Sequence, residues 1–361
     1  MRAEDVEALV ALAGQEHFDL VVVGPEAPLV AGAADELRRV GATVFGPSAA
    51  AARIEGSKAF AKEIMDAAGV PTAGVLDGPR APCVIKADGL AAGKGVFVCP
   101  TQAEADAAWS RAHELGDRVV VEELLEGEEV SVFALCDGES ALALPPVQDF
   151  KRLRDADEGP NTGGMGSYSP VPSLPDDEAA ELVEIAHRPV LAELARRGSP
   201  FVGLLYAGLM LTDEGPRVLE FNCRFGDPET QALLPRLEGD LLATLASAAA
   251  GDLDAVGVTA SSDAAVTVVM ASGGYPDAPE RGVEIHGIDA AEATGALVFH
   301  AGTALRDGRV LSAGGRVLNV TGRGASVGEA REQAYEAVAL IEFPGAHYRH
   351  DIAWRAVGVA S

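Results

Sequence analysis

The sequence has 361 residues, of which 48% are hydrophobic, so it is long enough for two or three domains with sizeable cores. Its net charge of −27 argues against nucleic acid or an anionic membrane as a partner, because both would repel the chain. No run of about 18 apolar residues predicts a membrane span, and the acidic start does not resemble a signal peptide. The cysteines form no C-x-x-C pair and are expected to be reduced core residues of a cytoplasmic protein: Cys83, Cys99, Cys136 and Cys223.

A βαβ unit is the first arrangement that the sequence predicts. Residues 4–13 have the pattern of an amphipathic helix, and the short apolar runs at 19–23 and 42–45 are expected to be buried parallel strands. A helical pattern over 29–40, which Gly41 ends, lies between the two runs. Because βαβ units build doubly wound sheets, the sequence predicts an α/β protein.

The later elements are more varied. Ser57 is predicted to cap a helix that carries Lys58 and ends at Gly69. From about Cys83 to Cys136 the pattern is strand, glycine-rich loop, strand, helix, strand and strand, which predicts a separate small module. A helix is expected at 177–197 and a pair of strands at 203–223. Short strands with glycine turns are expected from 254 to about 320, and a final helix at 325–341.

A glycine-rich loop lies inside the small module, between two β-patterns. It contains Gly89, Gly93, Lys94 and Gly95, and Lys86 precedes it. Glycines allow backbone N–H groups to approach phosphate oxygens closely, and lysine supplies positive charge. The loop leads into a strand, so it is not a Walker A loop, which opens a helix. Two interpretations remain, a strand–loop–strand flap over phosphates and an ordinary glycine-rich hairpin.

An acidic stretch follows the apolar strand pattern at 119–121. It begins with Glu122 and Glu123, includes Glu129, and leads into another strand pattern. Backbone groups of such a hinge can read adenine, and a carboxylate can accept hydrogen bonds from ribose hydroxyls. The alternative, which the residues alone favour, is a solvated acidic turn.

The strand pattern at 217–224 carries the strongest chemical signal. Strand alternation places Leu219, Phe221 and Cys223 toward the core, and Glu220 and Asn222 on the opposite face. A carboxylate and an amide oxygen on one face suit Mg²⁺ that carries nucleotide phosphates. Arg224 continues on that face and could grip a carboxylate or phosphate. An amphipathic surface strand is the alternative, but asparagine is a poor choice within such a strand.

Several loops carry weaker signals. The irregular loop over 148–168 mixes charges of both signs with four glycines, which favours a functional role. The segment 24–29 follows a strand at the edge of a parallel sheet where ligands bind, although an ordinary turn is the preferred interpretation. An ordinary turn is also the preferred interpretation of 314–317, and a contact to a sugar phosphate is the alternative. His300, within a strand pattern, is expected to be a packed residue rather than a base, and no Ser-His-Asp order is evident.

Together these segments resemble the ATP-grasp superfamily and, within it, the phosphoribosylamine–glycine ligase family. The matching segments follow the family's order across nearly the whole sequence: 24–30, 55–60, 86–96, 122–131, 159–170, 219–231, 273–276, 298–303, 314–318 and 351–356. The resemblance implies an ATP-grasp fold with three domains. Residues 1–56 would form a truncated biotin-carboxylase-like N-terminal βαβ domain. Residues 57–250 would form an ATP-grasp domain with a mobile lid at about 83–136, and residues 251–361 a small C-terminal domain.

The resemblance also implies roles for individual residues. The residues implied to bind ATP are Lys58, Lys86, Gly89, Gly93, Lys94, Gly95, Glu122, Glu123, Leu124 and Glu129. The implied metal ligands are Glu220 and Asn222. The residues implied to act in catalysis are Arg224, Lys86, Asp155 and Asp157. The residues implied to bind glycine or phosphoribosylamine are Gly24, Pro25, Glu26, Pro28, Asn161, Gly163, Gly164, Arg224, Gly315 and Arg316.

The reaction that the resemblance implies belongs to purine biosynthesis. The carboxylate of glycine attacks the γ-phosphate of ATP, and the amine of 5-phosphoribosylamine then attacks the resulting glycyl phosphate. Mg²⁺ or Mn²⁺ is the implied cofactor. The partners are expected to be these small molecules alone, without nucleic acid or membrane, and the protein is expected to be a cytoplasmic monomer.

Three departures from the family pattern are visible. Family members begin with a strand and a glycine-rich loop, whereas this sequence begins with a helix. The stretch 73–82 is shorter than in the family. Phe150 replaces the histidine that usually follows Gln-Asp in family members. Two alternative functions follow. One is another ATP-grasp ligase with a different acid or amine, against which the segments at 159–170 and 219–231 argue. The other is a truncated, acceptor-impaired ATP-binding relative.

Overall fold

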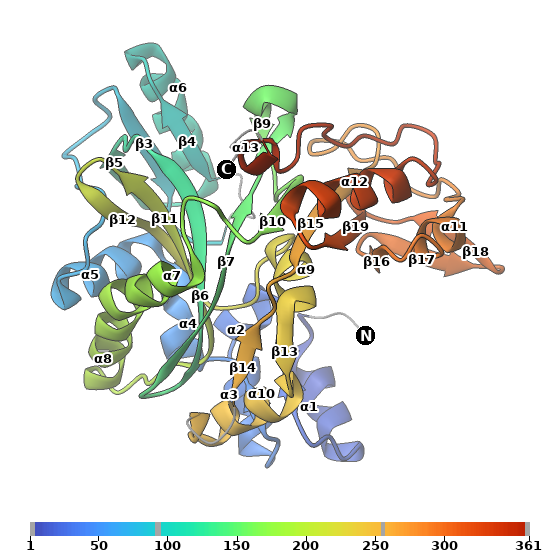
Figure 1. Cartoon of the computed structure of the whole chain (residues 1–361). Helices are drawn as coiled ribbons and strands as arrows, with labels where there is room; N and C mark the ends of the chain where they lie inside the picture. Colours follow the sequence, from blue (N-terminus) through green and yellow to red (C-terminus); the bar gives the residue numbers. More distant parts are fainter. Residues whose placement is uncertain (1–3, 91–94, 254–256, 358–361) are drawn as a thin grey trace. The chain divides into compact units, whose positions relative to one another are not determined.

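The computed structural model describes residues 4–90, 95–253 and 257–357 (Figure 1). The chain forms two compact units. The first unit comprises Met1–Leu144, Asp177–Phe225 and Gly239–Thr259, and the second comprises Pro145–Asp176, Gly226–Glu238 and Ala260–Ser361. The strands at which the chain passes from one unit to the other are β7 (Ala141–Asp149), β13 (Leu237–Gly239) and β14 (Val258–Ala260). None of the helices in the described part of the chain has the length and apolar character needed to cross a membrane.

The first unit begins with the predicted βαβ arrangement, in which β1 and β2 pair in parallel. Its elements are α1 (Val6–Gln15), β1 (Val21–Val22), α2 (Glu26–Val30), α3 (Ala33–Arg39), β2 (Val44–Phe45) and α4 (Ala49–Gly56). The single helix expected over 29–40 is divided, because Gly32 adopts a φ of +89°. The expected burial of the first strand was wrong, since Val22 is 42% exposed. In the described residues β1 pairs only with β2, whereas a buried parallel strand needs neighbours on both sides.

Helix α5 (Lys58–Ala68) begins and ends as the sequence predicts. The Ser57 hydroxyl accepts a hydrogen bond from the Phe60 N–H at 3.2 Å, and Gly69 ends the helix with a φ of +67°. Phe60, Ala61, Ile64 and Met65 are buried, so the opposite side of the helix is left to carry polar groups.

The small module predicted after residue 82 contains a three-stranded antiparallel sheet of order β4-β3-β5. It consists of β3 (Cys83–Ala87), β4 (Val96–Cys99), α6 (Gln102–Leu115) and β5 (Val119–Glu123). Helix α6 covers one face of this sheet, where Cys83 and Ile85 pack against Ala105 and Ala108 (Figure 1). The next strand, β6 (Glu128–Asp137), does not join the module as expected but pairs with β11.

Three further antiparallel strands of the first unit follow the sheet order β12-β11-β6. They are β11 (Val202–Thr212), β12 (Gly215–Asn222) and β6, and further helices of the unit are α7 (Asp176–Leu182), the π-helical turn Val183–His187, α8 (Arg188–Arg196) and α10 (Leu241–Ala250). The register shifts between Gly208 and Leu209, so that Glu220 and Val218 face consecutive residues of β11. Leu219 is therefore the extra residue of a β-bulge.

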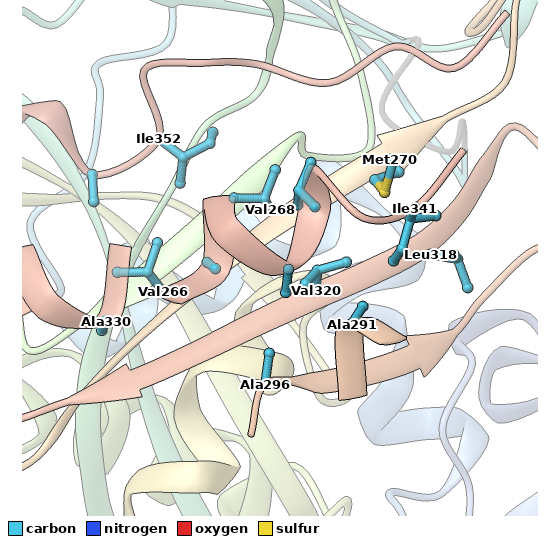
Figure 2. Packing of buried hydrophobic residues seen from close by; sticks show 14 of the residues in the cluster. Val266, Val268, Met270, Ala291, Ala296, Leu318, Val320, Ala330, Ile341 and Ile352 are labelled. Atoms are coloured by element: carbon cyan, nitrogen blue, oxygen red, sulfur yellow. The ribbon is translucent and has the colours of Figure 1, made fainter. Parts of the chain in front are cut away.

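In the second unit, neighbouring antiparallel strands follow the order β7-β10-β15-β19-β16. The remaining elements are β8 (Arg152–Arg154), the 3-10 turn Asp155–Asp157, β9 (Glu158–Asn161), β10 (Gly166–Ser169), α9 (Glu229–Leu233), the 3-10 turn Leu234–Arg236, β15 (Ala264–Ala271), α11 (Ile288–Glu292), β16 (Leu297–His300), β17 (Thr303–Arg306), β18 (Arg309–Ser312), β19 (Arg316–Gly324), α12 (Val327–Val338) and α13 (Trp354–Val357). Figure 2 shows Val268, Val320 and Ile341 within the core that α12 shares with β15 and β19. At Gly322 a Cβ atom would lie 2.1 Å from the Ala330 carbonyl oxygen, so glycine permits this close packing.

His187 is a buried titratable group packed against β11 and β12. Its Nε2 lies 3.2 Å from the Leu205 carbonyl oxygen, and its ring meets the Phe221 ring edge-on at 5.9 Å between centroids. Burial disfavours the charged imidazole and lowers the pKa of His187 to about 4. The unfolded chain therefore binds the proton more readily than the folded chain between about pH 6.5 and about pH 4.

This titration predicts a specific acid sensitivity. As the pH falls from about 7 to below about 4, His187 should remove about 3 kcal/mol from the free energy of unfolding. The measurement is urea unfolding of the wild type and of His187→Gln across this range. The variant should lose less stability on acidification than the wild type, and parallel curves for the two proteins would contradict the assignment.

Candidate functional site

A pocket in the first unit brings together charged side chains from four elements. It lies where α5, β3, β5 and β12 approach one another, and it is lined by Ile54, Lys58, Ala61, Lys62, Met65, Lys86, Glu122, Leu219, Glu220 and Phe221. Three of these residues are lysines and two are glutamates. Each of the three lysines lies 3.4 Å or less from a glutamate oxygen, so the pocket holds a network of paired charges.

A buried carboxylate joins two of the lysines. Glu122 is 2% exposed, and its two oxygens lie 2.7 Å from Lys86 Nζ and 2.9 Å from Lys62 Nζ. Lys86 also donates to the Leu219 carbonyl at 2.8 Å, and Lys62 donates to the hydroxyl of Thr72 at 2.7 Å. Desolvation lowers the pKa of Lys62, and Glu122 opposes that shift. Glu122 is thus not part of a solvated turn, which was the interpretation that the residues alone favoured.

Lys62 was not among the predicted site residues, although the sequence carries a signal for it. It lies four residues after Lys58 on α5, so the two side chains share one face of the helix. Lys58 Nζ lies 3.4 Å from Glu220 Oε2. The polar side of α5 therefore points two lysines into the pocket.

The bulge in β12 decides which of its side chains reach the pocket. Phe221 and Cys223 are buried as predicted, but the inward position expected of Leu219 was wrong, because Val218 is buried instead. The extra residue at Leu219 changes the alternation, and Leu219 lines the pocket with its backbone carbonyl on Lys86. Glu220 and Asn222 lie two residues apart, opposite Gly208 and Tyr206 of β11.

The donor set of Glu220 and Asn222 fits a hard divalent cation that receives its other ligands elsewhere. In the part of the chain that the structure describes, no group of three or more His, Cys, Asp or Glu side chains could hold a metal ion. A carboxylate and an amide oxygen are ligands typical of Mg²⁺, which keeps waters or substrate phosphates in its remaining positions.

Arg224 connects β12 to the N-terminal region of the same unit. Its guanidinium lies 3.0 Å from Glu55 Oε1 and 3.6 Å from Glu26 Oε2. Glu55 is buried and also accepts a hydrogen bond from the Cys223 N–H at 2.8 Å. Glu26, within the segment from Gly24 to Pro28, thus lies beside Arg224, and the assignment of both to substrate binding stays a prediction. Glu55 was not singled out from the sequence.

The glycine-rich loop is attached to the start of α5. The Asp88 carboxylate accepts from the Ser57 hydroxyl at 3.1 Å and from the Ala59 N–H at 3.3 Å, and the Ala87 N–H donates to the Gly95 carbonyl at 2.8 Å. These bonds fix the two ends of the loop, and Gly89 adopts a φ of +108°. The predicted phosphate ligands Gly93 and Lys94 lie outside the described residues.

The acidic hinge after β5 makes close backbone contacts. Glu123 accepts a hydrogen bond from the Gly74 N–H at 2.7 Å, and Leu124 follows it in the hinge. A Cβ at Gly127 would lie 2.1 Å from the Leu211 carbonyl oxygen, so the hinge approaches β11 closely. Glu129 lies opposite Met210 of β11.

In the second unit, predicted substrate residues from distant segments meet. The Arg316 guanidinium donates to the carbonyls of Gly163 at 2.5 Å and Asp227 at 2.7 Å. The Gly163 N–H donates to the Tyr275 hydroxyl at 3.1 Å, and a Cβ at Gly315 would lie 2.4 Å from the Tyr275 ring. Gly164 follows in the same turn, and Asn161 ends β9 opposite Arg152. Tyr275 is a contact residue that the sequence did not reveal.

Other predicted residues have different surroundings. Asp155 and Asp157 are engaged by residues of the C-terminal segment 349–355 rather than by the pocket residues named above. The expectation that His300 is packed was wrong, because it is exposed at the end of β16, with Nδ1 3.0 Å from the Thr303 hydroxyl. The four cysteines are free and buried, as predicted.

Three family models match the chain. They are the phosphoribosylglycinamide synthetase N domain at 1–55, ATP-grasp (A) domain at 56–230 and C domain at 265–355. A phosphoribosylamine–glycine ligase of Streptomyces coelicolor is 53% identical, over 99% of this chain and 88% of that protein. The chicken trifunctional purine biosynthetic protein adenosine-3 is 46% identical over 98% of this chain and 37% of its own length.

Solved structures agree with these matches. The crystal structure of phosphoribosylamine–glycine ligase from Thermotoga maritima has a TM-score of 0.77 at 39% identity, covering 86% of this chain and 82% of that one. The biotin carboxylase domain of 2-oxoglutarate carboxylase from Hydrogenobacter thermophilus has a TM-score of 0.70 at 17% identity, covering 95% and 79%, and shows the fold alone. The chain has the ATP-grasp fold and belongs to the phosphoribosylglycinamide synthetase family.

Proposed function

We propose that the protein joins glycine to 5-phosphoribosylamine at the expense of ATP, giving glycinamide ribonucleotide, ADP and phosphate in purine biosynthesis. The observation that carries the proposal is the lysine-lined pocket between two antiparallel sheets of the first unit, in a chain that matches its relatives over nearly its whole length. A pocket with Lys58, Lys62 and Lys86 suits the phosphates of a nucleotide.

Phosphoryl transfer to a carboxylate needs no nucleophile from the protein. A glycine carboxylate oxygen bonds to the γ-phosphorus as ADP leaves, and the phosphoribosylamine nitrogen then bonds to the acyl carbon of glycyl phosphate as phosphate leaves. The pocket supports this chemistry by positioning and charge neutralisation, through Lys58, Lys86 and Arg224. Cys223 is no alternative nucleophile, because burial raises the pKa of its thiol.

Glu220 and Asn222 are the residues proposed to hold the divalent cation, Mg²⁺ or Mn²⁺. The cation would neutralise charge on the phosphates of ATP when bound. Lys58 lies 3.4 Å from Glu220 and could contact both this carboxylate and a phosphate. The backbone of Glu122–Leu124 is proposed to read adenine, with Glu129 on the ribose and Gly89–Gly95 over the phosphates.

The other assignments remain part of the proposal. Residues proposed for phosphoribosylamine or glycine are Gly24, Pro25, Glu26, Pro28, Asn161, Gly163, Gly164, Arg224, Gly315 and Arg316. The proposed domains are 1–56, 57–250 with a lid at about 83–136, and 251–361. The protein is proposed to act as a cytoplasmic monomer.

The direct test is ADP release by the purified chain. Mg-ATP, glycine and phosphoribosylamine formed in situ are supplied together, and each is then omitted in turn. Release that needs all three is expected. Release that needs a different acid would favour another ATP-grasp ligase, and binding of Mg-ATP without turnover would favour an acceptor-impaired relative.

Glu220→Ala tests the metal assignment. Loss of the carboxylate should lower ADP release by about 100-fold or more while the thermal unfolding midpoint stays close to that of the wild type. Glu214→Ala is the matched control, because Glu214 is 79% exposed in the turn before β12. Wild-type turnover by Glu220→Ala would rule out Glu220 as a metal ligand.

Glu122→Gln tests the buried pairing with Lys62 and Lys86. The variant leaves two poorly solvated ammonium groups without their shared carboxylate, so it should lose about 3–5 kcal/mol of the free energy of unfolding. Urea unfolding measures the change. Glu63→Gln is the control, because Glu63 is 62% exposed in its ion pair with Arg197 and should change stability by about 1 kcal/mol or less. Equal small effects would show that the buried pairing contributes little.

A further inference from the structure

The turn Asp155–Asp157 in the second unit has an unfavourable backbone conformation. Ala156 and Asp157 have φ angles of +56° and +55°. Residues other than glycine rarely adopt this left-handed conformation, and it persists only where surrounding groups impose it. The turn connects β8 to β9, and β9 leads into the segment with Gly163 and Gly164.

The C-terminal segment 349–355 supplies the groups that impose this conformation. The Asp157 carboxylate accepts from Arg349 Nη1 at 2.8 Å and, through its other oxygen, from Arg355. The Asp351 carboxylate accepts from the Ala156 N–H at 2.8 Å. Asp155 accepts from the backbone N–H of His350 at 2.7 Å. Every residue of the turn is therefore bonded to the C-terminal segment.

Arg349 is the centre of this network. Its side chain is fully buried, and besides Asp157 it donates to both oxygens of Asp351 at 2.7 and 2.8 Å and to the Arg152 carbonyl at 3.2 Å. A buried guanidinium is stable only with such complete pairing. It therefore connects the start of β8 to the turn and to the C-terminal segment.

An aromatic ring supports both arginines. The guanidinium carbons of Arg349 and Arg355 lie 4.7 and 5.1 Å from the centroid of the Phe150 ring, a geometry that favours cation–π attraction. Phe150 is 1% exposed, and its N–H and carbonyl bond to Gly166 and Met165. Phe150 thus joins the arginines to the other end of the loop.

We propose that Asp157, Arg349 and Arg355 are positioning residues that fix the turn Asp155–Asp157 and, through β9, the Gly163–Gly164 segment. The inference rests on the proposed function, because the segment is one of the proposed substrate contacts. It replaces the catalytic role that the resemblance implies for Asp155 and Asp157, whose carboxylates are occupied by the C-terminal segment. These carboxylates act through the loop and do not contact glycine or phosphoribosylamine.

Asp157→Asn and Arg355→Lys, singly and combined, test the inference. Asparagine tolerates the left-handed conformation, so the first variant removes the charge while leaving the backbone preference intact. Lysine keeps the charge and loses the forked donors. Each variant should lower kcat/KM for glycine and phosphoribosylamine by at least about tenfold, because small misplacements of positioning groups are costly, while KM for ATP stays at the wild-type value.

The double variant separates positioning from direct contact. If both residues act through one shared interaction, the double variant should be no more impaired than the worse single variant. A strong effect of Asp157→Asn with none of Arg355→Lys would overturn the inference and assign Asp157 to substrate binding. Fully multiplicative effects, or no effect in either variant, would also overturn it.

Matched controls come from another hairpin of the second unit. Asp307→Asn changes an exposed aspartate that also has a positive φ, 51°, and Arg309→Lys changes an arginine that is 66% exposed. Both controls should behave as the wild type.

Amide hydrogen exchange of the peptides that cover 150–166 provides a readout independent of turnover. Exchange should be faster in Asp157→Asn and Arg355→Lys than in the wild type and the controls, and unchanged exchange would overturn the inference. If the wild type releases no ADP with all substrates while the exchange result holds, the proposed function is wrong. The inference that Asp157, Arg349 and Arg355 fix the turn is then still supported.

Discussion

The pairing of Glu122 with Lys62 and Lys86 is the interaction on which the candidate nucleotide pocket depends. The carboxylate lies on β5, one lysine on β3 and the other on α5. A single buried carboxylate therefore connects the small sheet to the helix. Without this carboxylate, the two buried lysine ammonium groups would lack a partner of opposite charge and would repel each other. With it, both Nζ atoms lie 2.9 Å or less from one carboxylate, at the place where we propose that phosphates bind.

Helix α5 connects this arrangement to the proposed metal ligand Glu220 and to the glycine-rich loop. Its N-terminal residue Lys58 reaches Glu220, and its first turn is capped by Ser57 and by the Asp88 carboxylate at the start of the glycine-rich loop. The helix therefore links the proposed metal ligand, the loop and the buried lysines. Precise placement of charge by rigid elements is the main contribution that a protein makes to phosphoryl transfer.

Local patterns predict the elements that local chemistry determines. The capping of α5 by Ser57, its end at Gly69 and the strands around the glycine-rich loop were all visible in the sequence. The alternation of Phe221 and Cys223 was visible too, and so was the family, through segments as long as 159–170 and 219–231.

Features that depend on a distant partner were not predictable. The bulge at Leu219 arises from pairing with β11, and it moved Val218 into the core in place of Leu219. The burial of Glu122 depends on lysines from other elements, so its own acidic surroundings in the sequence favoured a solvated turn. The engagement of Asp157 by Arg349 joins residues nearly two hundred positions apart, which no local pattern encodes.

The most direct test of this account is a crystal structure of the protein with Mg²⁺ and a non-hydrolysable ATP analogue. We expect phosphates beside Lys58 and Lys86, the cation on Glu220 and Asn222, and adenine at the backbone of Glu122–Leu124. A nucleotide bound away from the pocket between the two sheets, or a cation held by neither Glu220 nor Asn222, would contradict it.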